Sequence, residues 1–464
     1  MGGEFFYRFV NFFASILVAR SLGSEGFGKF SFIYVYLSFF EAFVELGMNP
    51  ILTRRIAQRG EEAPKILGNA ILVRIALVLL AFPVALFLTR RLGYPLSVQQ
   101  GIFLAYFQLF LTLRSIYETI FRVHLAMFYP ALCNGVRASI NFLLVAIVAF
   151  ASPHLPFFIL AYLVSGIVGL AGLIFFSRRF TPIFFEPDFR LIKALVKESA
   201  PIVISGYLSL LYCRVDVLML SLMKGFSDVG YYSAATRITE SLTVIANALL
   251  ASLFPLLSRS FKEDRPHFER LVAYAFRGLF LVGLPIALGG TFVGRDLMTL
   301  LFGSEYAPSG ITLTILCWFV LLCFQAVLLA NILIACGKQW ADMWISSALA
   351  LANIGMNLLL IPHYGYNGAA FATALTEGVG VAIYLAYAAK NSDIRIPLPL
   401  KEVVLALKVN LPFLIFLVAL RFLGVPVIPL ILLQVFLYGI LLMLFRLISW
   451  NDLKHYLSHS FARA

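Results

Sequence analysis

The chain alternates long apolar runs with short polar segments from its first residues to about position 450. A run such as 66–88 has about the length that an α-helix needs to cross ~30 Å of hydrocarbon. Such runs lack the strict polar and apolar alternation of a membrane β-barrel. The pattern predicts an all-α polytopic membrane protein with about fourteen transmembrane helices. We place them at about 4–20, 29–48, 66–89, 98–120, 130–151, 157–177, 200–223, 233–257, 271–293, 311–335, 342–361, 367–389, 403–423 and 427–448.

The composition supports this class and argues against an enzyme. Hydrophobic residues make up 61% of the chain and charged residues 13%, with a mean hydropathy of +0.93. A soluble domain carries roughly 25% charged residues. The five cysteines lie in apolar runs without a C-x-x-C pair, and no hydrolytic motif or histidine cluster occurs. We therefore expect no catalytic residues, no bound metal and no cofactor.

The net charge of +13 reflects topology rather than nucleic-acid binding. Lysine and arginine are about three times as frequent in one alternate set of loops, which includes 53–65, 178–197 and 258–270, as in the other. The bias predicts that both termini are cytoplasmic in a multi-pass protein of the cell (inner) membrane. The basic tail residues Arg446, Lys454 and Arg463 contribute to it.

The chain also repeats itself. The turn Gly23–Gly28 after the first span has a counterpart in Gly225–Gly230, about 200 positions later. Arg74 and Pro83 recur at a similar offset as Arg277 and Pro285, and Asn141 recurs as Asn357. Because six spans are an even number, the two copies insert the same way up, as in transporters built from parallel repeats. We predict a first half at 1–195, a second half at 196–392, and two additional helices with a cytoplasmic tail at 393–464.

Arginines inside the apolar runs are the strongest functional signal. Each costs several kcal/mol in lipid unless it faces a partner or a wet cavity. Several guanidinium groups at similar depth favour a hydrated vestibule that receives an anion such as phosphate. The alternative is a purely structural role, in which the long aliphatic side chains extend so that the guanidinium groups reach the membrane surface. The candidate substrate-binding residues are Arg8, Arg74, Arg114, Arg137, Arg214 and Arg277.

Acidic residues in the spans are candidate counter-ions or sites of ion coupling: Glu41, Glu45, Glu118, Asp216, Glu240 and Glu377. The spacing allows Arg114 to pair with Glu118 and Arg237 with Glu240 on single helix faces. Arg214 and Asp216 are two positions apart and point to different sides of their helix. Glu41 and Glu45 share a face, which makes them a candidate site for H+ or Na+.

The segment 23–29 resembles a phosphate-binding loop but lacks the required Ser or Thr, because Phe30 occupies that position. No strand precedes it, and it joins two membrane helices. We interpret it as a tight turn. Pro83 and Pro285, in the middle of equivalent spans, predict paired helix bends, with ordinary packing as the alternative.

Four ordered motifs resemble the polysaccharide exporters, which are the Wzx-like lipid-linked oligosaccharide flippases of the MOP (multidrug/oligosaccharidyl-lipid/polysaccharide) superfamily. They span about residues 10–390 and comprise A-R-S-L-G-S-E-G-F-G at 19–28, V-G-Y-Y-S-A-A at 229–235, L-F-G-S-E-Y at 301–306, and Asn357 followed by Ile361-Pro362 and G-Y-N-G-A-A at 365–370.

The resemblance implies two six-helix bundles in a V around a cationic cavity. It implies transfer of an undecaprenyl-pyrophosphate-linked O-antigen or exopolysaccharide repeat unit from the inner to the outer leaflet. The implied partners are the lipid-linked sugar, membrane lipids, and polysaccharide polymerase and chain-length machinery. The alternatives are a lipid II-type flippase, to which fourteen spans point, a cation-coupled multidrug exporter, and, in a different class, a membrane-embedded polymerase.

Overall fold

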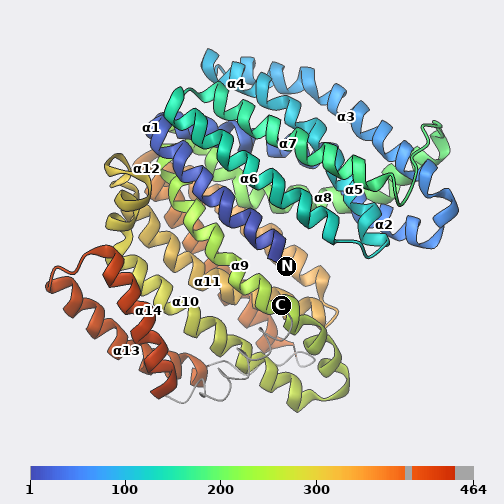
Figure 1. Cartoon of the computed structure of the whole chain (residues 1–464). Coiled ribbons are helices and arrows are strands. Elements are labelled where there is room, and N and C mark those ends of the chain that lie inside the picture. Colours follow the sequence, from blue (N-terminus) through green and yellow to red (C-terminus); the bar gives the residue numbers. More distant parts are fainter. Residues whose placement is uncertain (1, 392–399, 445–464) are drawn as a thin grey trace. The chain divides into compact units, whose positions relative to one another are not determined.

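The computed structural model describes residues 2–391 and 400–444, and these form helices joined by short connections (Figure 1). The helices in chain order are α1 (Gly2–Glu45), α2 (Met48–Gln58), η1 (Gly60–Glu62), α3 (Ala63–Arg91), α4 (Leu96–Tyr106), η2 (Phe107–Thr112), α5 (Leu113–Val123), α6 (Phe128–Ala151), α7 (Leu155–Ser177), α8 (Phe189–Met223), α9 (Phe226–Glu263), α10 (Arg265–Phe302), η3 (Ser304–Tyr306), α11 (Ser309–Ala335), α12 (Gln339–Lys390), α13 (Leu400–Phe422) and α14 (Val427–Leu444). The all-α membrane class is therefore confirmed.

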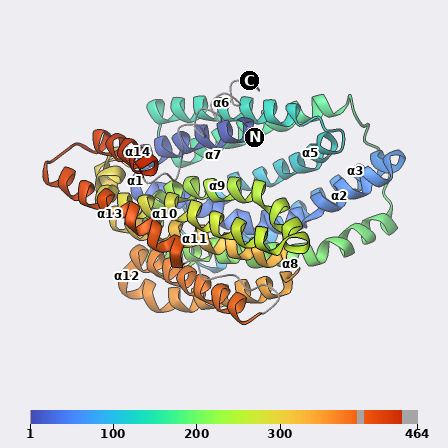
Figure 2. The ribbon, with the colours of Figure 1, turned by 90° about the horizontal axis from the view of Figure 1, so that it is seen from below.

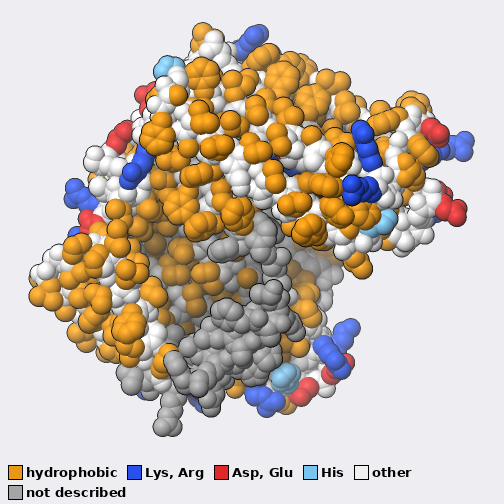
Figure 3. Space-filling view, viewed as in Figure 1, with side chains coloured by type: hydrophobic (Ala, Val, Ile, Leu, Met, Phe, Trp, Pro, Cys, Tyr) orange, Lys and Arg blue, Asp and Glu red, His pale blue; other side chains and the backbone are white. Residues whose placement is uncertain are grey.

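Eleven helical segments of the described residues are long and apolar enough to cross a membrane, and 427–441 in α14 is a shorter apolar helix. Large apolar side chains cover much of the outer surface, as Figure 3 shows over α4, α6 and α7. In water such a surface would aggregate, whereas in lipid it is the stable one. The protein is thus a multi-pass membrane protein. The number fourteen stays a prediction, and the end of the last expected span, at 445–448, lies outside the described residues.

Two helices are too long for a single crossing. A straight helix with the 52 residues of α12 would measure about 78 Å, more than twice the hydrocarbon thickness. Each long helix contains one glycine with positive φ, at Gly23 in α1 (φ 68°) and Gly365 in α12 (φ 55°). Only glycine adopts these angles without steric cost. We expected a polar connection between the first and second spans and between the eleventh and twelfth spans. The structure has instead a kink at a single glycine in each place.

The chain divides into two compact units, 1–233 and 234–464. In unit 1, α1 packs on α6 and α8, and α6 on α7. In unit 2, α11 lies between α10 and α12, and α13 packs on α10 and α14 (Figure 2). The helix α8 belongs to unit 1 by its contacts with α1, α2 and α3. The repeat boundary at 195/196 stays a prediction, and the expected segment 393–464 lies partly outside the described residues.

The two repeated glycine turns meet backbone to backbone inside unit 1. A Cβ atom on Gly28 would collide with the carbonyl oxygen of Phe226, and one on Gly230 with that of Ser24. Near this contact, the Tyr94 hydroxyl lies 3.1 Å from Ser221 Oγ. The absence of side chains at the two glycines therefore sets how closely the α1 turn and the α8–α9 turn approach.

Candidate anion-binding site

Unit 1 contains five of the six predicted arginines. Arg8 lies on α1, Arg74 on α3, Arg114 on α5, Arg137 on α6 and Arg214 on α8. The sixth, Arg277, lies on α10 in unit 2. The arginines differ sharply in exposure: Arg8 is exposed, Arg74 is fully buried, and the other four are half-buried.

Arg74 is occupied by groups of the chain. Its Nη1 donates to the Thr112 carbonyl (2.7 Å) and to Ser115 Oγ (2.5 Å), and its Nη2 donates to the Glu45 carbonyl (3.0 Å). The Glu45 carboxylate lies 4.0 Å from Nη1. Among the described residues, only Nε of this guanidinium lacks a hydrogen-bond partner. Arg74 therefore joins α3 to the end of α1 and to the η2–α5 junction.

Arg114 retains donor capacity. Its Nε lies 3.1 Å from Glu118 Oε1, which confirms the pairing expected from their i,i+4 spacing. Its side chain is 24% exposed, and its Nη1 is buried without a hydrogen-bond partner among the described residues. A buried charged donor without an acceptor is costly, so this atom favours an incoming oxygen ligand.

Arg137 lies in the same electrostatic environment. Its guanidinium carbon is 5.2 Å from the centre of the Tyr7 ring on α1, a cation–π distance. Its stem packs on Gly169 of α7, where any side chain would collide with it. Arg137 interacts electrostatically with Arg114 and Glu118. Arg114 and Arg137 are thus close enough to interact electrostatically, and the Nη1 donor of Arg114 has no acceptor among the described residues.

The acids of unit 1 surround these arginines. Glu41 interacts electrostatically with Glu45 and with the three arginines Arg137, Arg114 and Arg74. Glu41 is an exposed residue with these charged neighbours. Three cations with Glu41, Glu45 and Glu118 leave the group close to neutral. A phosphate would therefore compete with the carboxylates for the guanidinium donors.

The remaining predicted residues lie elsewhere. Asp216 is buried on α8 and accepts a hydrogen bond from the Tyr232 hydroxyl at the start of α9, whereas Arg214 is half-buried. Arg237 and Glu240 form the expected i,i+3 pair in unit 2, at 3.8 Å. Glu377 is buried on α12 of unit 2, and the Arg277 guanidinium carbon lies 5.4 Å from the Tyr274 ring centre.

Sequence reasoning missed the neutral polar groups of the site. Besides Tyr7 and Ser115, the buried Asn141 donates to Asn11 Oδ1 (3.0 Å) and accepts from Ser165 Oγ (3.3 Å). This chain of bonds joins α1, α6 and α7 next to Arg137. Asparagines within apolar runs were the available signal, because an amide in lipid needs a partner on another helix.

Ion pairs outside the spans connect α8 to the basic end of unit 1, where Lys and Arg gather around α2 and α5 (Figure 3). Glu198 accepts from Arg54 at 2.7 Å and also from Arg55, and this bonding holds its pKa below the ordinary value. Asp188 caps α8 and contacts Lys65 at 2.9 Å. The Lys65 hydrogen bond lowers the pKa of Asp188.

The chain is similar in sequence to proteins of glycan and polysaccharide biosynthesis. The probable low-salt glycan biosynthesis flippase Agl15 of Haloferax volcanii is 24% identical over 393 residues, covering 83% of this chain and 81% of the relative. The capsular polysaccharide biosynthesis protein CapF of Staphylococcus aureus is 28% identical over 186 residues, covering 40% and 47%.

Solved structures share the fold. A lipid II flippase MurJ in an inward closed conformation superposes with a TM-score of 0.79 over 97% of this chain and 98% of its own, at 16% identity. An inward-facing multidrug resistance MATE family transporter of the MOP superfamily gives a TM-score of 0.68 over 82% and 93%, also at 16% identity. These likenesses confirm the transporter fold that the motifs indicated.

Two family models match the chain. The MatE model matches residues 201–359. The model described as polysaccharide biosynthesis protein matches residues 1–261, which is more than half of the chain and includes Arg74, Arg114, Arg137 and both glycine turns. Because this match extends over the whole of unit 1, the chain belongs to the polysaccharide biosynthesis protein family.

Proposed function

We propose that the protein is a flippase that moves a polyprenyl-pyrophosphate-linked oligosaccharide from the inner to the outer leaflet of the cell membrane. The observation that carries the proposal is the group of charged side chains inside unit 1, where Arg114 has an unused buried donor beside Arg137. Pyrophosphate oxygens accept hydrogen bonds from guanidinium groups, often two at a time. The family match and the flippase relative support a transporter rather than an enzyme.

The proposal narrows the set of arginines. Arg114 and Arg137 bind the pyrophosphate. Arg74 has a structural role, because groups of the chain occupy its Nη1 and Nη2 donors. Arg8, Arg214 and Arg277 act at other stages of transport. Glu41 takes up the H+ or Na+ that drives transport, which the second carboxylate beside it, Glu45, favours. Both termini are cytoplasmic, and the polymerase and chain-length machinery receive the product.

Reconstitution in liposomes tests this function. The substrate is undecaprenyl pyrophosphate that carries a fluorescent sugar, and a membrane-impermeant quencher reports how much has reached the outer leaflet. We expect Arg114→Ala and Arg137→Ala each to slow transfer at least about tenfold, since a hydrogen bond to a charged group contributes about 1.5–3 kcal/mol. Arg91→Ala, at the exposed end of α3, is the control and should transfer normally. Full activity of the double variant R114A/R137A would exclude the proposed site.

The same assay separates the rivals. A multidrug exporter is the second candidate, favoured by the MatE match and by the acid Glu41. It would move a cationic dye and not the lipid-linked sugar. A lipid II-type flippase, favoured by the MurJ likeness, would prefer lipid II. Repeating the transfer with and without H+ or Na+ gradients, in wild type and Glu41→Gln, tests the coupling ion.

A further inference from the structure

Two tyrosine rings and one amide lie together where α1, η2 and α7 meet in unit 1. The Tyr34 and Tyr162 rings are 5.6 Å apart between centroids, and the ring of the buried Phe30 packs against them at 4.7 and 5.5 Å. Gln108 of η2 donates from Nε2 to the Tyr34 hydroxyl at 2.7 Å. We refer to Tyr34, Gln108 and Tyr162 as the Tyr–Gln cluster.

Part of each residue in the Tyr–Gln cluster remains uncovered by the protein. The three residues are half-buried, whereas Phe30 beside them exposes only 2% of its surface. A primary amide has two N–H groups and an oxygen acceptor, and the bond from Gln108 to Tyr34 uses one N–H. The cluster therefore combines aromatic rings with further hydrogen-bonding capacity. This combination suits a sugar, whose C–H face packs on aromatic rings while its hydroxyl groups bond to amides.

The cluster lies on the same face of α1 as the acids of the candidate site. At 3.6 residues per turn, positions 34, 41 and 45 of this helix fall within an arc of about 40°. Glu41 interacts electrostatically with Arg114 and Arg137. In a membrane span, a face that carries charged side chains lies toward the protein interior or a water-filled space and not toward hydrocarbon. Tyr34 therefore belongs to the same polar face as the anion-binding group.

The segment η2–α5 gives the same alignment from the other side. A 3₁₀-helix has three residues per turn, so Gln108 and Leu111 lie on one side of η2, and Arg114 follows at the next step. The Leu111 side chain packs on Gly166 of α7, where a Cβ atom would collide with it. Tyr162 lies one turn before Gly166. This side of η2 therefore faces the part of α7 that carries the cluster.

The spacing along the helices fits a sugar joined to a pyrophosphate. Tyr34 precedes Glu41 by seven residues and Gln108 precedes Arg114 by six, and each interval corresponds to about 10 Å along its helix. A pyrophosphate with the first one or two sugars of its chain spans a comparable length. A ligand whose pyrophosphate contacts Arg114 can therefore place a sugar at the Tyr–Gln cluster.

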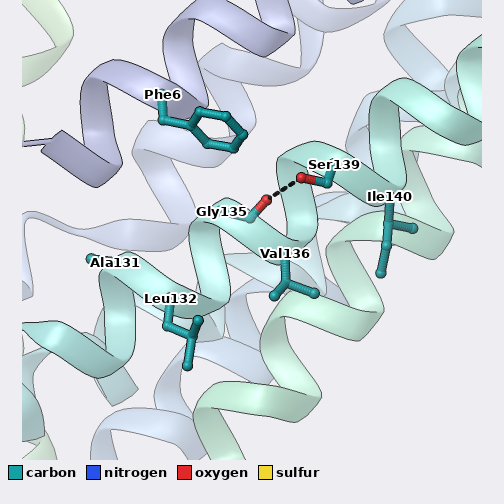
Figure 4. A pocket seen from close by; sticks show the side chains of 7 residues that line it. All are labelled: Phe6, Ala131, Leu132, Gly135, Val136, Ser139 and Ile140. Atoms are coloured by element: carbon teal, nitrogen blue, oxygen red, sulfur yellow. Dashed lines mark hydrogen bonds between the residues drawn. The ribbon is translucent and has the colours of Figure 1, made fainter.

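The hollow between α1 and α6 lacks this chemistry. It has a volume of about 580 Å³, and its walls are Phe6 of α1 and residues from successive turns of α6, among them Leu132 and Gly135 (Figure 4). The one hydroxyl in the walls is that of Ser139, which donates to the Gly135 carbonyl at 3.1 Å (Figure 4). The other side chains in the walls are apolar, so this hollow offers a sugar few hydrogen bonds.

We propose that Tyr34, Gln108 and Tyr162 bind the sugar that is joined to the pyrophosphate of the substrate. The proposal rests on the proposed function and adds the residues that select the sugar unit. The two tyrosine rings pack against the C–H face of the sugar, and the Gln108 amide bonds to its hydroxyl or acetamido groups. Arg114 and Arg137 bind the pyrophosphate, which every substrate of this class shares. Discrimination between sugars therefore comes from the Tyr–Gln cluster and not from the arginines.

Binding of two probes to the purified full-length protein tests the proposal. One probe is undecaprenyl pyrophosphate carrying N-acetylglucosamine, and the other is undecaprenyl pyrophosphate without a sugar. We expect Gln108→Ala and Tyr162→Leu each to weaken binding of the sugar probe at least about threefold and that of the sugar-free probe less than about twofold. Tyr162→Phe keeps the ring and should retain most of the affinity for the sugar probe.

Matched controls separate the two proposals. Gln99→Ala removes another half-buried glutamine that donates to the chain, at 2.8 Å to the Tyr94 carbonyl, and should leave both affinities unchanged. Arg114→Ala should weaken both probes. If Gln108→Ala and Tyr162→Leu bind both probes like wild type, or lose both equally, the sugar site is overturned and the flippase proposal stands. Binding of neither probe by the wild type would instead contradict the proposed function.

A photoreactive diazirine on the acetamido group of the sugar probe identifies the contact directly. After irradiation, we expect mass spectrometry to find the label on peptides that contain Tyr34, Gln108 or Tyr162. An excess of unlabelled sugar probe should abolish this labelling. Labelling confined to the connections between helices would overturn the assignment of the sugar to the Tyr–Gln cluster.

Discussion

Arg74 in unit 1 and Arg277 in unit 2 occupy equivalent places in the repeat, yet the two units use them differently. Arg74 has no exposed surface and donates to three groups on neighbouring elements. Arg277 is half-buried and lies beside Tyr274, a ring that is exposed for more than half of its surface. Similar depth in the membrane therefore does not imply a similar role, because the neighbouring helices decide how far a guanidinium is buried.

The buried amides show the same contrast. Asn141 of unit 1 bonds to Asn11 on another helix, so it ties α6 to α1. Its repeat counterpart Asn357 donates to Asn353, four residues earlier on the same helix. Unit 1 thus uses repeated polar positions to join helices. In unit 2 the bond from Asn357 to Asn353 stays within α12.

The largest expected effect comes from removing the two equivalent arginines. Arg74→Ala should lower the free energy of unfolding by at least about 3 kcal/mol, because each hydrogen bond from a charged donor contributes about 1.5–3 kcal/mol. Arg277→Ala should cost less than Arg74→Ala, because Arg277 is only half-buried. Thermal unfolding of the purified variants in detergent measures both. Arg74→Lys keeps the charge but not the planar fork, so it should rescue stability only in part. Equal losses for Arg74→Ala and Arg277→Ala would remove the distinction between the units.

A medium effect is expected at the glycine turns. Gly230→Ala should destabilise unit 1 by about 1–3 kcal/mol, because the new methyl group would collide with the Ser24 carbonyl. Gly278→Ala in α10 of unit 2 is the matched helical control, since no atom lies within 4 Å of a Cβ there. It should be neutral or stabilise the helix by up to about 1 kcal/mol. The same unfolding experiment compares them, and a harmless Gly230→Ala would show that the turns can separate at little cost.

The smallest expected effect is on the stability of the fold at acidic pH. Arg55 and Arg54 hold the pKa of Glu198 below its ordinary value of 4.5. A lowered pKa means that the carboxylate stabilises the fold above pH 4.5 and loses this contribution as the pH falls through the folded-state pKa. Glu198→Gln should therefore lower the free energy of unfolding slightly at pH 7, by less than about 1 kcal/mol for so exposed a pair. The difference from wild type should shrink as the pH falls below 4.5, and Glu61→Gln in η1 is the control variant. A difference that stays constant as the pH falls would instead reflect packing.

Features set by neighbours along the chain could be predicted from the sequence. Apolar runs of about 20 residues are stable in lipid only when their backbone bonds are satisfied within the run, so they specify helices. Side chains four positions apart lie on one face of a helix, so the pair Arg114–Glu118 followed from spacing alone. The glycine turns were also predictable, since positive φ favours glycine.

Which arginine remains available to a ligand was decided only by the tertiary structure. The partners of Arg74 lie 29 to 41 positions away in sequence, and those of Arg137 come from α1 and α7. The hollow between α1 and α6 likewise depends on Phe6 lying near Gly135, more than 100 positions later in the sequence. Sequence fixes the depth of a charge in the membrane, because depth depends on rise along one helix. The hydrogen-bond and ion-pair partners of that charge depend on how several helices pack. The sequence of a single helix carries no information on that packing.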